Sequence, residues 1–248
     1  DDGTPVGCET DEFGKIWINS QTWSVISGIG TPEQMKAGMD AVSEYLDTGM
    51  GLRKLAPGFE TYPYVEDPFS TYNPGNGENG AVFCHAHTWA VIAEAILGNA
   101  DRAWKYYNDI LPHNCIEKVG LDTYKSEPYA WVSNIDDVEN KKRGWGNVSH
   151  ITGTAPWMVI AAERYLLGIR SELDGLCIDP CIPNDWDKIT ISRKYQGKTL
   201  NITVENQGHR SKGVTGLKVN GEMIAGNFIP KAVIIDSKND TVEITAYM

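Results

Sequence analysis

The spacing of hydrophobic residues changes once along this chain, near residue 183. Between Ile18 and about Gly168 the apolar positions mostly recur every three to four residues, the period of an α-helix with one buried face. The pattern is clearest after Thr31, which is placed to cap a helix starting at Pro32, while Gln34 completes a capping box. The apolar face of this predicted helix consists of Met35, Met39, Val42 and Leu46.

Further helices are predicted downstream of the helix that starts at Pro32. They cover residues 81–99, 100–114 and about 155–168. Gly98 separates the first two, Pro112 ends the second and Gly168 ends the third. The connections 51–79 and 115–148 are long and rich in Pro, Tyr, Trp, Asn and Asp. Because long structured loops on a helical scaffold usually carry function, we expect the site there.

After Pro183 apolar and polar residues alternate, β-branched residues become frequent, and Gly, Asn and Asp mark turns. Four strands are predicted, in residues 188–195, 198–206, 214–222 and 240–248. Such alternation is typical of antiparallel sheets with one buried face. The chain is therefore predicted to be mainly α with a β-domain. The helical part spans residues 1–172, and residues 173–248 hold a linker and a small antiparallel β-sandwich.

Composition excludes several classes of function. The chain has 248 residues, 41 % of them hydrophobic, and a formal charge of −11, and we identify no Lys/Arg-rich run in it. Nucleic acids and anionic membranes need a clustered basic surface, so neither is expected as a partner. No apolar run reaches the ~20 residues of a membrane span, and the first residues lack the features of a signal peptide. We therefore expect a cytoplasmic protein.

Five cysteines in a chain of this size do not indicate a disulfide framework or a zinc site. Cys177 and Cys181 form the nearest pair, and without further ligands nearby we interpret them as small buried side chains. No metal site and no cofactor are predicted.

The first predicted helix, around Trp17 to Ile26, is apolar and has no capping element or polar helix before it. Helical hairpins arranged in a ring need their neighbours to bury both sides, as stacked repeats do. We therefore expect these residues to be the later part of a larger helical barrel. The missing part would be supplied by further sequence of the same protein or by a complementary chain.

Five motifs, in this order and approximate spacing, resemble those of the cellobiose and chitobiose phosphorylases, glycoside hydrolase family 94. They read GKIWINSQTWSVISG, NPGNGENGAVFCHAHTWAVIAEA, SEPYAWVSNI, ITGTAPW and GLCIDPCIPNDW. The resemblance covers nearly the whole chain. It implies the later part of an (α/α)6 barrel followed by a small C-terminal β-domain, in a homodimer. It also implies inverting phosphorolysis of a β-linked disaccharide, which yields an α-sugar 1-phosphate and a free sugar.

Inorganic phosphate is the co-substrate of such a reaction and is already an anionic nucleophile. An inverting hydrolase uses one carboxylate to protonate the leaving oxygen and a second to activate water. With phosphate as the nucleophile, the second carboxylate becomes unnecessary. The resemblance assigns phosphate binding to His85 and to the pair Thr152 and Gly153. His87 lies about 200° from His85 around a helix, so we assign His87 to packing.

The same resemblance implies sugar contacts at the Gly-rich loop and in SEPYAW. Expected sugar-binding residues are Glu78, Asn79, Glu127, Tyr129 and Tyr72, and Trp131 could add a further aromatic face. Each also has a simpler explanation. Acidic residues are favoured in the first turn of a helix, and Trp and Tyr are as often core as sugar platform.

Two departures from the family pattern matter. No counterpart of its Asp-rich segment is present in these residues, so no catalytic residue is assigned here and the general acid is expected upstream. Gly77 stands where cellobiose-type members carry a lysine, which removes a cation from the acceptor side. The disaccharide therefore stays open between cellobiose, chitobiose, laminaribiose and cellobionic acid.

Two other classes of function remain open at this stage. One is an (α/α) glycoside hydrolase that uses Glu78 and Glu127 as its acid and base, with their carboxyl groups roughly 6.5–9.5 Å apart. The other is a non-catalytic carbohydrate-binding or assembly subunit that contributes half a barrel to a partner.

Overall fold

The computed structural model describes residues 7–60, 72–137 and 140–248. The chain divides into two compact units, of which the first contains residues 1–97 and 105–159. The second contains residues 98–104 and 160–248.

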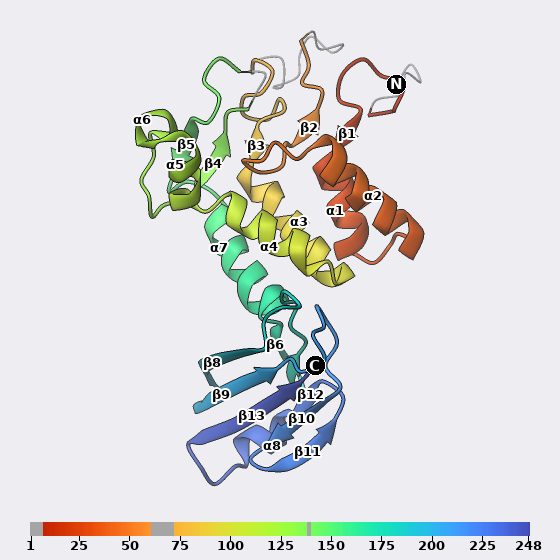
Figure 1. Ribbon diagram of the computed structural model, residues 1–248, viewed down its shortest axis with the longest axis vertical. Helices are drawn as coiled ribbons and strands as arrows, with labels where there is room; N and C mark the ends of the chain where they lie inside the picture. The colour runs from red at the N-terminus through yellow and green to blue at the C-terminus, as the bar shows by residue number, and fades with distance from the viewer. Residues whose placement is uncertain (1–6, 61–71, 138–139) are drawn as a thin grey trace. The chain divides into compact units, whose positions relative to one another are not determined.

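Helices pack side by side in the first unit (Figure 1). They are α1 (Ile18–Ile26), α2 (Pro32–Tyr45), α3 (Cys84–Leu97), α5 (Pro112–Val119) and the short α6 (Leu121–Tyr124). The predicted capping box of α2 is confirmed, since Thr31 and Gln34 exchange hydrogen bonds between side chain and backbone. The central helix α3 is the most buried, and α1 packs on both α2 and α3.

The connection 115–148 is more ordered than we predicted. Pro112 ends one helix but also begins the next, because its fixed φ suits the first helical position and it needs no hydrogen-bond donor there. Two strands follow, β4 (Val132–Ile135) and β5 (Gly146–Ser149). Together with β3 (Val82–Phe83) they form a small antiparallel sheet in the order β3-β4-β5. A second ribbon pairs β1 (Ile16–Trp17) with β2 (Leu55–Ala56).

Two helices connect the units along the chain. The helix α4 (Ala100–Asp109) starts in the second unit, where the indole nitrogen of Trp104 donates to the carbonyl of Cys181 over 2.9 Å. The helix α7 (Thr154–Ile160) continues as a π-helical segment, η2 (Ala161–Leu166). It ends before Gly168, whose φ of +68° is a conformation that favours glycine.

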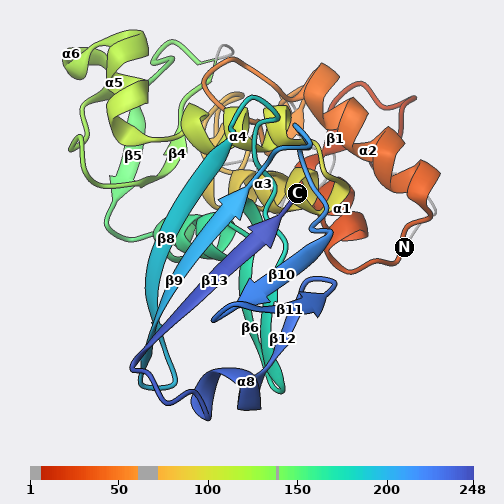
Figure 2. The ribbon, with the colours of Figure 1, turned by 60° about the horizontal axis from the view of Figure 1, so that its bottom comes forward.

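The second unit contains two sheets around one core (Figure 2). The larger sheet has the order β11-β10-β13-β9-β8, and the smaller has the order β12-β7-β6. The strands are β6 (Ile169–Glu172), β7 (Gly175–Ile178), β8 (Lys188–Tyr195), β9 (Lys198–Glu205), β10 (Gly216–Val219), β11 (Glu222–Ala225), β12 (Phe228–Pro230) and β13 (Thr241–Tyr247), and one short helix, α8 (Lys231–Ile235), follows β12.

The four strands expected after Pro183 are present as β8, β9, β10 and β13. One part of the expectation is wrong, because β13 pairs with β9 in parallel and the sheet is therefore mixed. The expected division after residue 172 falls at the turn of the hairpin β6–β7, although both strands contribute to the core of the second unit. The two-residue turn of this hairpin consists of Leu173 and Asp174, since Glu172 pairs with Gly175.

The cysteines are all free thiols. Cys181 is fully buried as expected of a small core side chain, whereas Cys177 is only partly buried, so the expectation is wrong for Cys177. Within the described residues, no helix is both long and apolar enough to cross a lipid bilayer.

Candidate functional site

The small sheet β3-β4-β5 determines which motifs meet. Strands β3 and β5 both run antiparallel to β4, so they run in the same direction and end at the same edge of the sheet. His85 follows β3 at this edge, and Thr152 follows β5. The segment that leads into β4, residues 127–131, reaches the same edge because β4 runs the opposite way. We call this edge the histidine edge.

At the histidine edge the imidazole of His85 lies directly on Gly153. A Cβ atom built on Gly153 would lie 2.7 Å from Cε1 and 2.9 Å from Nδ1 of His85, closer than real side-chain contacts allow. Only glycine therefore permits this packing without a shift. The structure thus brings together His85 and Gly153, which are 68 positions apart in the sequence.

Aromatic side chains surround the imidazole of His85. The ring centroids of Trp89 and Trp157 lie 5.0 Å and 6.2 Å from that of His85. Burial lowers the pKa of His85, so the ring is favoured in its neutral form. Its Nε2 atom is buried and has no hydrogen-bond partner among the described residues, and the same holds for Nε1 of Trp89. Buried polar atoms normally have hydrogen-bond partners, so the surface formed by His85 and Trp89 is suited to binding a polar ligand.

Thr152 is held by the start of α7. Its hydroxyl oxygen accepts a hydrogen bond from the backbone amide of Thr154 over 3.1 Å and lies 2.8 Å from the Thr154 hydroxyl. The Thr154 hydroxyl in turn donates to the carbonyl of Val132 on β4. Thr152 is therefore fixed next to the sheet edge, with part of its hydrogen-bonding capacity used in capping the helix.

A hollow of about 260 Å³ lies beside these residues. Its lining consists of Tyr129, Ala130, Trp131, His150, Thr152 and Ala155. The Tyr129 side chain is 79 % exposed, and Nε1 of Trp131 is buried without a partner among the described residues. The hollow is smaller than complete ligand pockets, which typically measure ~300–1,000 Å³, so it forms only part of a binding site.

Glu127 stands at the rim of this hollow and interacts with His150, whose Nε2 lies 3.6 Å from Glu127 Oε1. Hydrogen bonds from its own backbone amide and from the Ser149 hydroxyl lower the pKa of Glu127. A carboxylate that is held ionised in this way accepts hydrogen bonds well but is a poor proton donor near neutral pH. Glu127 is therefore suited to binding hydroxyl groups.

The other predicted sugar residues, Glu78, Asn79 and Tyr72, precede β3 in the chain. Glu78 forms an ion pair with Lys54, whose side chain is largely buried and whose pKa is lowered by that burial. Lys54 thus places a cation beside Glu78, the residue after Gly77. Tyr72, which is 40 % exposed, packs its ring against Gly77.

Asn79 does not fit the sugar contact we expected. Its side chain is 1 % exposed and accepts from the backbone amide of Phe59, while its amide nitrogen donates to the carbonyls of Phe59 and Tyr72. These bonds occupy both ends of the amide group. We therefore correct the expectation for Asn79, which holds two loop segments together.

Sequence reasoning missed several polar residues near these motifs. Asp136 follows β4, is buried, and accepts hydrogen bonds from Asn76 and Asn147, both over 2.8 Å. Its neighbour Asp137 pairs with Arg53. The Asp-Asp pair Asp136 and Asp137, within the long connection 115–148, was the available signal. The described residues contain no group of three or more His, Cys, Asp or Glu arranged to hold a metal ion.

His87 behaves as predicted, since it is fully buried and its two ring nitrogens contact backbone groups. The amide of Leu52 donates to Nδ1, and Nε2 lies 2.7 Å from the carbonyl of Tyr106.

A separate hollow of about 840 Å³ lies along α1 and α2, and none of the predicted site residues lines it.

Comparison with known proteins places these motifs in a family. Residues 1–168 match the model of the glycosyl hydrolase 94 superfamily, catalytic domain, and residues 169–220 match the glycosyl hydrolase family 65, C-terminal domain. An N,N'-diacetylchitobiose phosphorylase from Vibrio proteolyticus is 38 % identical over 93 % of this chain and 28 % of its own length. A solabiose phosphorylase from Paenibacillus borealis is 33 % identical over 98 % of this chain and 31 % of its own length.

A 3-O-beta-D-glucopyranosyl-beta-D-glucuronide phosphorylase, also from Paenibacillus borealis, is 36 % identical over 90 % of this chain and 29 % of its own length. The chain thus spans less than a third of the length of these relatives. The family model covers the first unit and reaches the start of β6. On this evidence the chain belongs to the glycosyl hydrolase 94 superfamily.

Proposed function

We propose that this chain is part of an enzyme that cleaves a β-linked disaccharide with inorganic phosphate, with inversion at the anomeric carbon. The products are an α-sugar 1-phosphate and a free sugar. The observation that carries the proposal is the buried, unpartnered Nε2 of His85, whose ring rests on Gly153 beside Thr152. The family relationship and the names of the phosphorylase relatives support it.

In the proposed reaction His85, Thr152 and Gly153 bind phosphate below the sugar. The neutral imidazole donates one hydrogen bond from Nε2–H without adding a full positive charge, which would weaken phosphate as a nucleophile. A phosphate oxygen forms a bond to the anomeric carbon as the bond to the glycosidic oxygen breaks. The leaving oxygen takes a proton from an acid.

We propose that this acid is an aspartate outside these 248 residues, in the part of the protein that precedes them. The neighbouring residues then bind the sugars: Glu127 and Tyr129 at the histidine edge, with His150 and Trp131 added to the set. Glu78 and Tyr72 belong to the loop that precedes β3 and are proposed to contact the sugar from there. Phosphate serves as co-substrate, and no cofactor takes part.

The complete enzyme is proposed to be a cytoplasmic homodimer, in which the first unit completes an (α/α)6 barrel and the second forms a β-sandwich. The disaccharide stays open between chitobiose, cellobiose, laminaribiose and cellobionic acid.

Hydrolysis by Glu78 and Glu127 is less well supported. Glu78 is paired with Lys54, and Glu127 is held ionised. An inverting hydrolase needs its two carboxyl groups on either side of one bond, one of them protonated.

The test measures sugar 1-phosphate released from each candidate disaccharide by the complete protein, with and without phosphate. We expect release only with phosphate. In the His85→Ala variant the apparent KM for phosphate should rise at least tenfold, with a smaller change for the sugar, because a hydrogen bond to a charged group is lost (about 1.5–3 kcal/mol). His113, exposed on α5, provides the control variant His113→Ala. Release of free sugars without phosphate would favour a hydrolase, and sugar binding without turnover would favour a non-catalytic subunit.

A further inference from the structure

Two buried aspartates, Asp136 and Asp137, follow β4 and contact the loop that carries Glu78. We call residues 73–79, which lead into β3, the Glu78 loop. Strand β4 pairs with β3 in antiparallel fashion, so the segment that leaves β4 lies beside the segment that leads into β3. Asp136 and Asp137 are 1 % and 3 % exposed, so neither carboxylate is accessible to a substrate. Their contacts with the protein therefore define what they can do.

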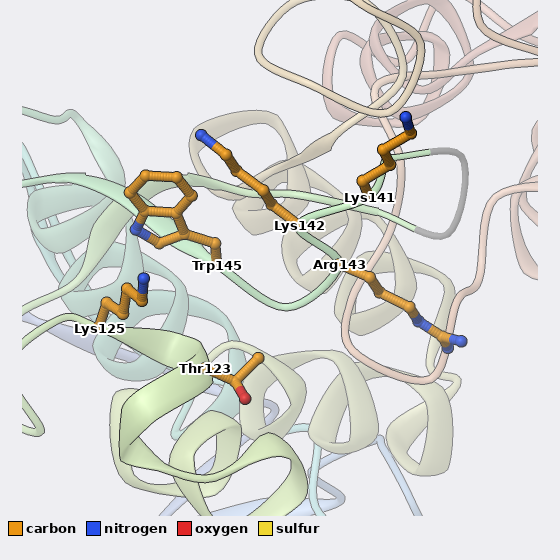
Figure 3. A pocket seen from close by; sticks show the side chains of 6 residues that line it. All are labelled: Thr123, Lys125, Lys141, Lys142, Arg143 and Trp145. Carbon is orange, nitrogen blue, oxygen red and sulfur yellow. The ribbon is translucent and has the colours of Figure 1, made fainter.

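The backbone of Asp136 is fixed by the turn between β4 and β5. Its amide donates to the carbonyl of Trp145 over 2.9 Å, and its carbonyl accepts from the amide of Gly144 over 2.7 Å. Figure 3 shows the last part of this turn, from which the exposed side chains of Lys142 and Arg143 extend in different directions. These cations do not gather around one ligand, and the turn serves as a support for Asp136.

The carboxylate of Asp136 joins two segments. Its Oδ1 atom accepts hydrogen bonds from the side-chain amides of Asn76 in the Glu78 loop and Asn147 on β5, both over 2.8 Å. Burial raises the pKa of Asp136, and these two hydrogen bonds oppose that rise because they stabilise the ionised form. Hydrogen bonds to a charged oxygen in a buried environment are stronger than those between neutral groups. Asn76 is therefore held firmly, two positions before Glu78.

Asp137 reaches the same loop in two ways. Its backbone amide donates to the carbonyl of Gly75 over 2.9 Å. Its carboxylate forms an ion pair with Arg53. The residue after Arg53 is Lys54, which pairs with Glu78. The two aspartates thus hold both the loop and the strand that supplies the ionic partner of Glu78.

Hydrogen bonds within the Glu78 loop carry this attachment to Glu78 itself. The amide of Gly75 donates to the carbonyl of Asn79 over 2.7 Å, and the amide of Asn79 donates to the carbonyl of Asn76 over 3.0 Å. Glu78 lies inside this closed set of bonds and cannot shift without breaking some of them. A carboxylate that is already held in one place loses less conformational entropy when it binds a ligand.

We propose that Asp136 and Asp137 are positioning residues for sugar binding, which hold Glu78 where it accepts hydrogen bonds from sugar hydroxyl groups. Asp136 acts through Asn76, and Asp137 acts through the loop backbone and Arg53. This role for the two aspartates rests on the proposed function, in which Glu78 binds the sugar. The affinity for the sugar is then set in part by two acids that the sugar does not touch.

The test compares Asn76→Ala with Asn147→Ala in the complete protein. Each variant removes one amide donor from the same oxygen of Asp136, but only Asn76 belongs to the Glu78 loop. Calorimetry with chitobiose and with cellobiose, without phosphate, measures the dissociation constant. In Asn76→Ala it should rise about tenfold, because the loop loses a hydrogen bond to a charged group. In the matched control Asn147→Ala it should change much less, and the apparent KM for phosphate should stay near the parent value in both.

Two further pairs of variants separate positioning from folding. Asp136→Asn keeps an oxygen for Asn76 and should bind the disaccharide more tightly than Asp136→Ala, which keeps none. Arg53→Gln removes the cation beside Asp137 and should weaken disaccharide binding, while Arg53→Lys keeps the charge and should restore part of it. Circular dichroism checks that each variant is folded, and the comparison of Asn76→Ala with Asn147→Ala decides the question if Asp136→Ala does not fold.

Equal weakening by Asn76→Ala and Asn147→Ala would mean that Asp136 only stabilises the fold and would overturn the proposal. Unchanged disaccharide binding in Asn76→Ala would overturn it as well, and unchanged binding in Arg53→Gln would remove Asp137 from the role. A parent protein that binds the disaccharide but does not phosphorolyse it would contradict the proposed reaction alone, since these experiments measure binding. A parent protein that binds no disaccharide would overturn both.

Discussion

Two histidines of one motif, two positions apart, have opposite surroundings. Both ring nitrogens of His87 are occupied by backbone groups, whereas Nε2 of His85 has no partner among the described residues. Burial lowers the pKa of both rings. For His87 the geometry also fixes the tautomer, because the Leu52 amide needs an acceptor at Nδ1 and the Tyr106 carbonyl needs a donor at Nε2.

This arrangement predicts a pH dependence of stability. The pKa of His87 is lowered in the folded state, so above the unfolded value of about 6.5 its contribution is fully present. Below about 6.5 the unfolded chain takes up the proton first, and the free energy of unfolding falls as the pH drops. Urea unfolding at pH 7.5 and 5.5 measures this loss. His87→Gln, which keeps one donor and one acceptor, should be less stable at pH 7.5 and lose less on acidification. In the control His113→Gln, the free energy of unfolding should fall between pH 7.5 and 5.5 by as much as in the parent. An equal fall in His87→Gln would contradict the assignment of this pH dependence to His87.

A second prediction concerns the contact between Gly153 and His85. In Gly153→Ala the new methyl group must push the imidazole away, so the apparent KM for phosphate of the complete enzyme should rise at least tenfold. Gly216→Ala is the control, since its Cβ would lie 3.7 Å from the nearest atom, an ordinary contact. Phosphate titrations of the initial rate distinguish the two variants. An unchanged apparent KM for phosphate in Gly153→Ala would mean that the contact between Gly153 and His85 does not contribute to phosphate binding.

At the scale of elements, the sequence predicts local features such as helix caps and strand alternation more accurately than the pairing of strands that are distant in the chain. The cap at Thr31 and the alternation in β9, where Leu200, Ile202 and Val204 point inward, depend on neighbours a few residues away. The parallel pairing of β9 with β13 joins residues about forty positions apart, and no local pattern specifies it. The candidate site shows the same contrast between local features and contacts of distant residues. The motifs that meet could be named from the sequence, but the pairing of Glu78 with Lys54 could not.

The capping box of α2 gives a prediction at this scale. Thr31→Ala removes the acceptor for the amide of Gln34 and should lower the free energy of unfolding by about 1 kcal/mol. Thr31→Ser keeps the hydroxyl and should stay within a few tenths of a kcal/mol of the parent. Urea unfolding of both variants at one pH makes the comparison. Equal stability of the alanine and serine variants would mean that the cap contributes little.

For the whole molecule, the proposed acid and much of the proposed pocket wall lie outside these residues. Proton transfer to a leaving group typically contributes 10²–10⁴-fold in rate, so the 248-residue chain alone should not form α-glucose 1-phosphate above background. Adding the remaining part of the protein as a separate fragment should restore turnover if the two fold together. The assay is sugar 1-phosphate formation by the purified chain with and without that fragment. Robust turnover by the chain alone would place the acid within it.

The common direction of β3 and β5 has a consequence for how such a protein can change over time. Segments at the edge opposite His85, such as the turn that carries Lys142, can lengthen or alter their charge while the spacing between His85 and Gly153 is kept. The proposed phosphate-binding residues at one edge are thereby insulated from variation at the other. A lineage with this architecture can acquire new loop chemistry by small insertions without rebuilding the contact between His85 and Gly153.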